Sequence, residues 1–291
     1  MNTGLILGGG GRVGIAWETG VLAALREHAG FDPTACSVAV GTSAGAHVAA
    51  MAMGGVDLIE RARAELDGTL LSTPEPPEPA PSAATAASGG TSAVPADIMR
   101  LMLSPEGPNI ERGRAIGELA MAATPKLDQD AVVHLMRSEL PLSTWPQGDL
   151  RVTSVRCETG ETVLWTRDDG IDLATAVASS CAIPGFFAPV HFDGAHYCDA
   201  PRLPSAAQLA KEKDLDAIIF IGPRAGALAN VAEDAELDSL ERQGLSVVRI
   251  TDGPDFAEVS TELLDQRLRP RAAQIGLDDG RRAAQQVAAL R

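Results

Sequence analysis

The sequence predicts an α/β fold with a mainly parallel central sheet flanked by helices. Two observations lead to this prediction. In the first fifty residues, two short apolar runs at 4–7 and 36–40 alternate with helical patterns, and each run is followed by glycine. After residue 204, helical patterns alternate again with the apolar runs 217–222 and 246–250. Strands that alternate with helices form parallel sheets, because a right-handed crossover helix returns the chain in the same direction.

Length and composition suit one domain over residues 1–291. A chain of 291 residues with 45% hydrophobic residues can bury a sizeable core. The net charge of -15 argues against a nucleic-acid partner and against electrostatic docking on anionic lipid. The four cysteines lack metal-ligand spacing, so we expect free thiols and no metal. The sequence shows no signal-peptide pattern and no apolar run of membrane-spanning length, so we expect a cytoplasmic protein.

The first strand leads into a glycine-rich loop. Residues 4–7 read Gly-Leu-Ile-Leu and continue into residues 8–14, which read Gly-Gly-Gly-Gly-Arg-Val-Gly. A helix is expected from near Ile15 to Gly30. Its apolar positions recur at helical spacing: Trp17, Val21 and Leu25.

The glycine loop allows two interpretations from different functional classes. The spacing Gly9-x-Gly11-x-x-Gly14 matches the dinucleotide-binding fingerprint, but such a site needs an acidic residue at the end of the second strand. Gly41-Thr42-Ser43 occupies that place, which disfavours a nicotinamide cofactor. In the other interpretation, the amides of Gly9, Gly10 and Gly11 form an oxyanion hole, which requires a nucleophile at the same sheet edge.

The second strand, expected at residues 36–40, ends in a pattern typical of a nucleophile elbow. Gly41-Thr42-Ser43-Ala44-Gly45 follows it, and an alanine-rich helical run continues from 46 to 53. Glycines two before and two after the serine leave room for a sharp turn that projects the hydroxyl from the sheet edge. We therefore interpret Ser43 as a candidate nucleophile, flanked by Gly41, Thr42, Ala44 and Gly45. The alternative is an ordinary turn in which Ser43 or Thr42 caps the helix.

Residues 57–140 indicate helices and one low-complexity insert. Residues 72–95 consist almost wholly of Pro, Ala, Ser, Thr, Gly and Glu, so we expect a flexible surface loop there. A lid over the site is the functional alternative. Asp128 is the expected N-cap of the last helix in this part. The helical patterns cover about 57–71, 96–103, 111–123 and 127–140.

From residue 150 the pattern changes to short strands, and helices return after the second of two expected hairpins. Asp172 is expected to open a short helix between the hairpins, and the second hairpin ends at Asp199-Ala200-Pro201. The expected elements are the hairpins 151–156 with 162–166 and 186–192 with 195–198, the helices 204–212 and 229–242, the strands 217–222 and 246–250, and terminal helices.

A serine nucleophile needs a partner that accepts its proton. No histidine lies after residue 196, so the α/β-hydrolase order Ser, Asp, His could close only through His191 or His196. His47 follows Ser43 by one helical turn and is more simply explained as a packing residue. A carboxylate that acts directly is the alternative, and Asp199 at the end of the second hairpin is the first choice.

Four ordered motifs resemble those of bacterial patatin-like phospholipases. Residues 8–14 resemble that family's N-terminal oxyanion loop, and residues 41–45 match its Gly-x-Ser-x-Gly elbow. Residues 178–184 are similar to its Ala-Ser-x-Ala-Ile-Pro segment, and Asp199 occupies the place of its catalytic acid. The resemblance implies a patatin-like three-layer sandwich and ester hydrolysis by a Ser43-Asp199 dyad, without histidine, metal or cofactor.

Two positions depart from the family pattern. The Asp-Gly-Gly or Asp-Gly-Ala box reads Asp199-Ala200-Pro201, and Arg12 lies one residue before the usual loop arginine, with Val13 in its place. The expected function is a serine acyl-ester hydrolase that acts on a lipid or a small acyl ester, with peripheral membrane contact as an option. The alternative is a catalytically weak or inactive patatin fold that binds a lipid or a protein.

Overall fold

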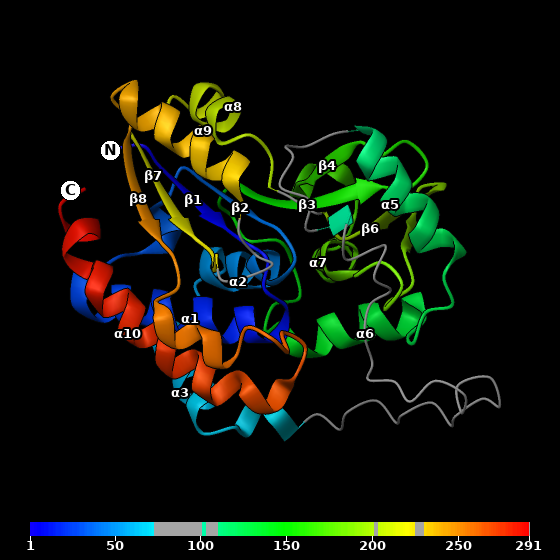
Figure 1. Cartoon of the computed structure of the whole chain (residues 1–291), viewed down its shortest axis with the longest axis horizontal. Helices are drawn as coiled ribbons and strands as arrows, with labels where there is room; N and C mark the ends of the chain where they lie inside the picture. The colour runs from blue at the N-terminus through cyan, green and yellow to red at the C-terminus, as the bar shows by residue number, and fades with distance from the viewer. Residues whose placement is uncertain (73–100, 103–109, 201–202, 225–229, 291) are drawn as a thin grey trace.

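The computed structural model describes residues 1–72, 101–102, 110–200, 203–224 and 230–290 (Figure 1). Within these residues, one sheet of eight strands has the order β5-β6-β3-β2-β1-β7-β8, with β4 paired to β3. The strands are β1 (Thr3–Leu7), β2 (Val38–Gly41), β3 (Leu150–Arg156), β4 (Thr162–Trp165), β5 (Val190–Phe192), β6 (Ala195–Cys198), β7 (Ala217–Ile221) and β8 (Ser246–Ile250).

The centre of the sheet is parallel, as the sequence predicts. Strand β1 pairs in parallel with β2 and β7, β2 with β3, and β7 with β8. The hairpin strands β4, β5 and β6 add the antiparallel pairs at one side. Leu7 at the end of β1 lies opposite Gly41 at the end of β2. The loops that follow these two strands therefore begin side by side at the carboxyl edge of the sheet.

Helices cover both faces of the sheet, which gives the predicted three layers (Figure 1). Leu5 and Leu7 pack in the core formed with α1, α2, α7 and α10, whereas Ile6 packs in the core formed with α8 and α9. This division follows from the alternation of side chains along a strand. The helices are α1 (Gly11–Ala29), α2 (Ala44–Met53), α3 (Leu58–Leu66), α5 (Ile110–Ala122), α6 (Gln129–Glu139), α7 (Leu173–Cys181), α8 (Ala206–Lys213), α9 (Val231–Arg242) and α10 (Arg269–Ala288).

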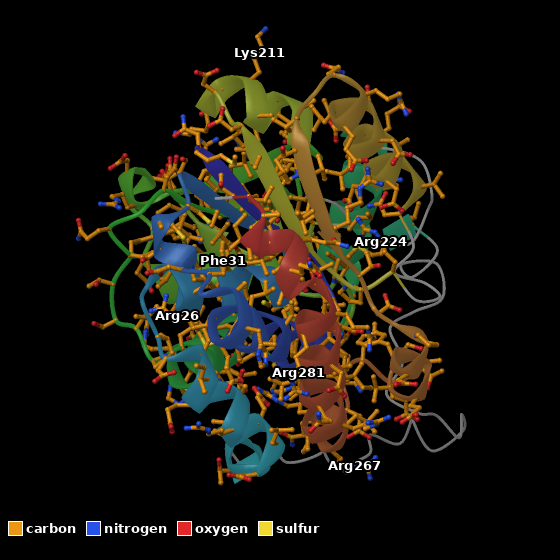
Figure 2. All side chains as sticks on the ribbon, turned by 90° about the vertical axis from the view of Figure 1, so that its left-hand side faces the viewer. Arg26, Phe31, Lys211, Arg224, Arg267 and Arg281 are labelled. Atoms are coloured by element: carbon orange, nitrogen blue, oxygen red, sulfur yellow. The ribbon has the colours of Figure 1, made fainter. Side chains whose placement is uncertain are left out.

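Helix α10 packs along α1 and closes one outer face of the molecule (Figure 2). Their contact is close because glycines lie in it: a Cβ on Gly276 would come within 2.0 Å of the Trp17 carbonyl oxygen. Arg281 on α10 and Lys211 on α8 project from the surface in the same view. In the part of the chain described here, no helix is long and apolar enough to span a membrane.

Three predicted boundaries differ from the structure. Helix α1 begins at Gly11 and not near Ile15, because the end of the glycine loop forms the first turn, with Gly14 N donating to Gly10 O at 2.8 Å. The helix expected at 57–71 ends at Leu66 and is followed by a 3₁₀ turn at Thr69–Ser72.

The strand expected at 186–192 is shortened to Val190–Phe192. Its first half turns back instead, because the amides of Phe186 and Phe187 both donate to Ile183 O, at 3.0 and 2.9 Å. The insert predicted at 72–95 lies outside the described residues apart from Ser72, and the helix expected at 96–103 lies outside them apart from residues 101–102. That residues 1–291 form a single domain stays a prediction.

Candidate functional site

Ser43 lies at a sharp turn between β2 and α2. Its backbone has φ 51° and ψ -120°, and its side chain makes no capping hydrogen bond to α2, although it occupies the N-cap position. The turn needs glycine on both sides. A Cβ on Gly41 would lie 2.3 Å from the Gly45 carbonyl oxygen, and a Cβ on Gly45 would lie 2.4 Å from the Leu7 backbone. These contacts produce the tight elbow that the spacing of Gly41, Ser43 and Gly45 predicts.

The glycine loop lies directly against this elbow. Gly8 O accepts a hydrogen bond from Gly45 N at 2.8 Å, and a Cβ on Gly9 would lie 3.6 Å from the Ser43 Cβ. Among the described residues, the amides of residues 9–11 and of Ala44 have no hydrogen-bond partner. Because these amides lie at or beside the N-termini of α1 and α2, the helix dipoles favour negative charge there. The site can therefore stabilise an anion beside Ser43.

Asp199 follows β6 and lies beside Ser43. Its side chain is buried, with the residue 3% exposed. Burial raises the pKa of Asp199 to about 8, although hydrogen bonds from the Ser43 side chain and the Ala200 amide lower it. Its Oδ1 atom has no hydrogen-bond partner among the described residues. The structure thus brings Ser43, Asp199 and the glycine loop together, from three separate parts of the sequence.

The comparison with protein-family models matches residues 5–200 to the patatin-like phospholipase family. This range contains the glycine loop, the elbow and Asp199. The chain belongs to the patatin-like phospholipase family. Its fold is the patatin fold, which confirms the fold that the sequence motifs imply.

Two solved structures illustrate the likeness. The structure is similar to VipD from Legionella pneumophila, with a TM-score of 0.47 and 16% identity, over 99% of this chain and 67% of that chain. It is also similar to the type III effector ExoU, with a TM-score of 0.45 and 18% identity, over 99% of this chain and 53% of that chain. ExoU from Pseudomonas aeruginosa has also been solved with SpcU. This patatin-like chain spans about half the length of ExoU, and it matches no curated protein by sequence.

The helix α7 supplies contacts to the elbow that sequence reasoning missed. Ser180 Oγ accepts a hydrogen bond from Ser43 N at 2.9 Å, and Cys181 Sγ donates to Ser43 O at 3.3 Å. Both residues lie in the segment that carries the family resemblance, but nothing in the sequence distinguishes Ser180 from Ser179. The two serines differ only in the side of α7 that each presents, which needs the tertiary structure.

The histidines of this patatin-like chain do not serve Ser43. No histidine side chain hydrogen-bonds to the Ser43 side chain in the described residues. His47 is fully buried, and burial lowers its pKa to about 3. Its two ring nitrogens have no hydrogen-bond partner among the residues that the structure describes. His196 instead pairs with Glu158, with 2.9 Å between Nδ1 and Oε1, and His191 lies beside His196 on the β5–β6 hairpin.

Glu18 is a buried acid close to the glycine loop. It lies on α1 and is fully buried, and burial raises its pKa well above the usual range, which the nearby Gly8 amide offsets only in part. Since Gly8 N donates its hydrogen bond to Ile221 O, at 2.9 Å, it does not neutralise this acid. Glu18 is therefore uncharged at neutral pH, and it adds no negative charge beneath the loop.

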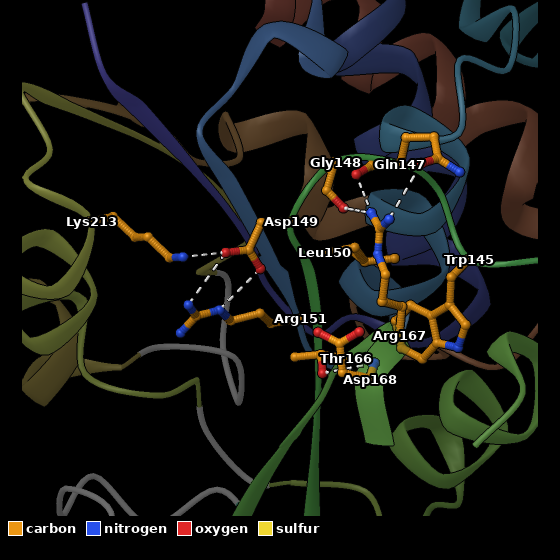
Figure 3. A pocket seen from close by; sticks show the side chains of 10 residues that line it. All are labelled: Trp145, Gln147, Gly148, Asp149, Leu150, Arg151, Thr166, Arg167, Asp168 and Lys213. Carbon is orange, nitrogen blue, oxygen red and sulfur yellow. Dashed lines mark hydrogen bonds and ion pairs between the residues drawn. The ribbon is translucent and has the colours of Figure 1, made fainter. Parts of the chain in front are cut away.

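A pocket of about 340 Å³ lies elsewhere, at the amino end of β3 (Figure 3). Since β2 and β3 are parallel, this pocket is at the opposite sheet edge from Ser43. Its charged groups pair with one another: Asp149 binds both Arg151 and Lys213, at 3.2 and 2.6 Å. Among the described residues, no cluster of three or more His, Cys, Asp or Glu could hold a metal ion.

Proposed function

We propose that this patatin-like chain is a serine acyl-ester hydrolase for lipids, with Ser43 as nucleophile and Asp199 as base. The observation that supports it is the hydrogen bond between the Ser43 side chain and the buried Asp199 carboxylate. This contact occurs at an elbow whose shape exposes the serine oxygen to an adjoining loop of unpaired amides. Membership of the patatin-like phospholipase family implies lipid acyl hydrolysis.

The proposed reaction has two stages. Asp199 removes the proton from Ser43 Oγ, and the serine oxygen attacks the carbonyl carbon of the ester. Amides of residues 9–11 stabilise the oxyanion of the tetrahedral intermediate. The bond to the alcohol then breaks, and Asp199 gives its proton to the departing oxygen. In the second stage, Asp199 activates water, which attacks the acyl-enzyme and releases the carboxylic acid.

The charge of the chain suits a particular kind of lipid surface. A net charge of -15 opposes approach to an anionic membrane. We therefore propose zwitterionic or neutral lipid as the substrate class, reached by peripheral contact. Nothing in this proposal requires a cofactor or a nucleic acid.

The test is release of fatty acid from phosphatidylcholine vesicles and from short-chain esters. We expect Ser43→Ala and Asp199→Asn to lower the rate by more than about a thousandfold each, because each removes a group that takes part in bond making. Ser246→Ala, at an exposed position on β8, is the matched control and keeps full activity. Hydrolysis that survives in the Ser43 variant would disprove the assignment.

A second function, lipid or protein binding without turnover, is favoured by one observation. Since burial raises the pKa of Asp199 to about 8, most of the molecules hold a neutral Asp199 at pH 7, and a neutral acid cannot take the serine proton. Saturable lipid binding with no fatty-acid release at pH 9, where Asp199 is ionised, would support this alternative.

A further inference from the structure

The end of α7 contacts the backbone of both residues of the proposed pair. Ser180 Oγ accepts from Ser43 N, and Cys181 Sγ donates to Ser43 O. The next residue, Ala182, accepts a hydrogen bond from the Asp199 amide at 3.0 Å. Residues 180–182, the α7 end segment, therefore connect the nucleophile and the base through consecutive residues.

We infer that Ser180 is a positioning residue that holds the Ser43 nucleophile in its reactive conformation; this rests on the proposed function. With φ at 51°, Ser43 has a backbone conformation that a non-glycine residue keeps only when its surroundings impose it. The Ser180 hydroxyl is fully buried, and it binds the Ser43 amide directly. Without this acceptor, the amide would be buried without a partner, which is unfavourable.

The rest of α7 is fixed firmly enough for Ser180 to act in this way. The neighbouring Ser179 Oγ lies 2.7 Å from Ser154 Oγ on β3, and Ser154 Oγ also accepts from Trp165 Nε1 at 3.2 Å. Asp172 caps the other end of the helix by accepting from Thr175 N. Adjacent serines thus attach α7 to the sheet and to the elbow, respectively.

This arrangement provides a matched control. Ser179→Ala and Ser180→Ala each remove one buried hydroxyl from the same helix turn, but only Ser180 binds Ser43. We expect Ser180→Ala to lower kcat about tenfold to a hundredfold with KM unchanged, since small displacements of a reacting atom have effects of this size. We expect Ser179→Ala to keep kcat within about twofold of the wild type.

Hydrogen exchange of the Ser43 amide, followed by NMR, tests the inference without any activity. In the wild type, this amide is expected to exchange at least about tenfold more slowly than that of Ala44, which is also buried but has no partner among the described residues. In Ser180→Ala the protection of Ser43 is lost, and in Ser179→Ala it remains. The wild-type comparison holds even if Ser180→Ala does not fold.

Two results would overturn the inference: equal exchange of the Ser43 and Ala44 amides in the wild type, or equal kcat in the two alanine variants. A wild type that hydrolyses no ester but shows Ser43 protection lost in Ser180→Ala would contradict the proposed function alone. It would leave Ser180 as the residue that fixes the Ser43 backbone.

Discussion

Ser43 and Asp199 are each held in a state that is unfavourable by itself. Ser43 has a positive φ, which costs about 1–3 kcal/mol in a non-glycine residue. Asp199 is a carboxylate removed from water. Both costs are expected at a site whose function needs a projected oxygen and a base of raised pKa. Two predictions follow from the pKa of Asp199.

The first prediction concerns the pH dependence of activity. Since Asp199 must be ionised to act as base and burial raises its pKa to about 8, kcat/KM is expected to rise about tenfold per pH unit below pH 8 and to level off above it. Initial rates with a short-chain ester between pH 5 and 10 measure this. A profile that is flat from pH 6 to 9 would exclude Asp199 as the base.

The second prediction concerns stability. The folded protein keeps the Asp199 proton up to about pH 8, whereas the unfolded chain loses it near 3.8. The free energy of unfolding of the wild type should therefore fall, relative to Asp199→Asn, as the pH rises between these values. We expect the difference to grow by about 2–5 kcal/mol and then remain constant. Urea unfolding at pH 5 and pH 8.5 measures it; a constant difference would mean that Asp199 is ionised throughout.

At the scale of elements, the sequence was informative where local pattern and tertiary structure agree. The β1–loop–α1–β2–elbow unit could be predicted because apolar runs and glycines mark its strands and turns. The start of α1 was missed because glycine loops lack any helical signal, although residues 11–14 form its first turn. The early end of the strand at 186–192 depends on hydrogen bonds to Ile183 O, and apolar composition alone does not reveal them.

The candidate site was predictable in part for the same reason. Ser43 and residues 9–11 belong to dense local motifs, and Asp199 follows a hairpin turn. Ser180 and Glu18 were not singled out, because their roles depend on which way a helix faces after packing. Contacts between residues 137 positions apart, such as Ser43 with Ser180, leave no local signal in one sequence.

The third prediction separates two glycines of these elements. Gly45→Ala places a Cβ 2.4 Å from the Leu7 backbone, so α2 must move away from β1, and we expect a loss of at least about 2 kcal/mol in unfolding free energy. Gly9→Ala makes only a 3.6 Å contact with the Ser43 Cβ, so we expect stability within about 0.5 kcal/mol of the wild type.

The activity of Gly9→Ala is nevertheless expected to fall, because the new methyl group lies beside the serine that the ester must reach. Urea unfolding and ester hydrolysis on the two variants give both quantities. A Gly9 variant with full activity would place the acyl group away from the glycine loop.

At the scale of the whole molecule, a buried ion pair joins elements that are distant in sequence. Arg269 at the start of α10 binds Glu65 on α3 through two hydrogen bonds of 2.8 and 2.5 Å, with side-chain exposures of 2% and 1%. The long separation of 204 residues means that this pair fixes the packing of α3 and α10 around α1.

The fourth prediction is that this pair is sensitive to loss of one partner. Glu65→Gln leaves the Arg269 charge buried, and we expect a loss of about 3–5 kcal/mol in unfolding free energy. The control is Glu60→Gln, which breaks the exposed pair with Arg63 on the same helix and should change stability by less than about 1 kcal/mol. Equal effects in urea unfolding would show that the buried pair does not organise these helices.

The central claim, that Ser43 is an activated nucleophile served by Asp199, is tested most directly by covalent labelling. The wild type, Ser43→Ala and Asp199→Asn are treated with a fluorophosphonate at pH 9, and intact mass and peptide mapping locate the adduct. The account predicts a single adduct on Ser43 in the wild type, none in Ser43→Ala, and labelling slowed by at least about a hundredfold in Asp199→Asn. No adduct on folded wild-type protein, or an adduct on another residue, would contradict it.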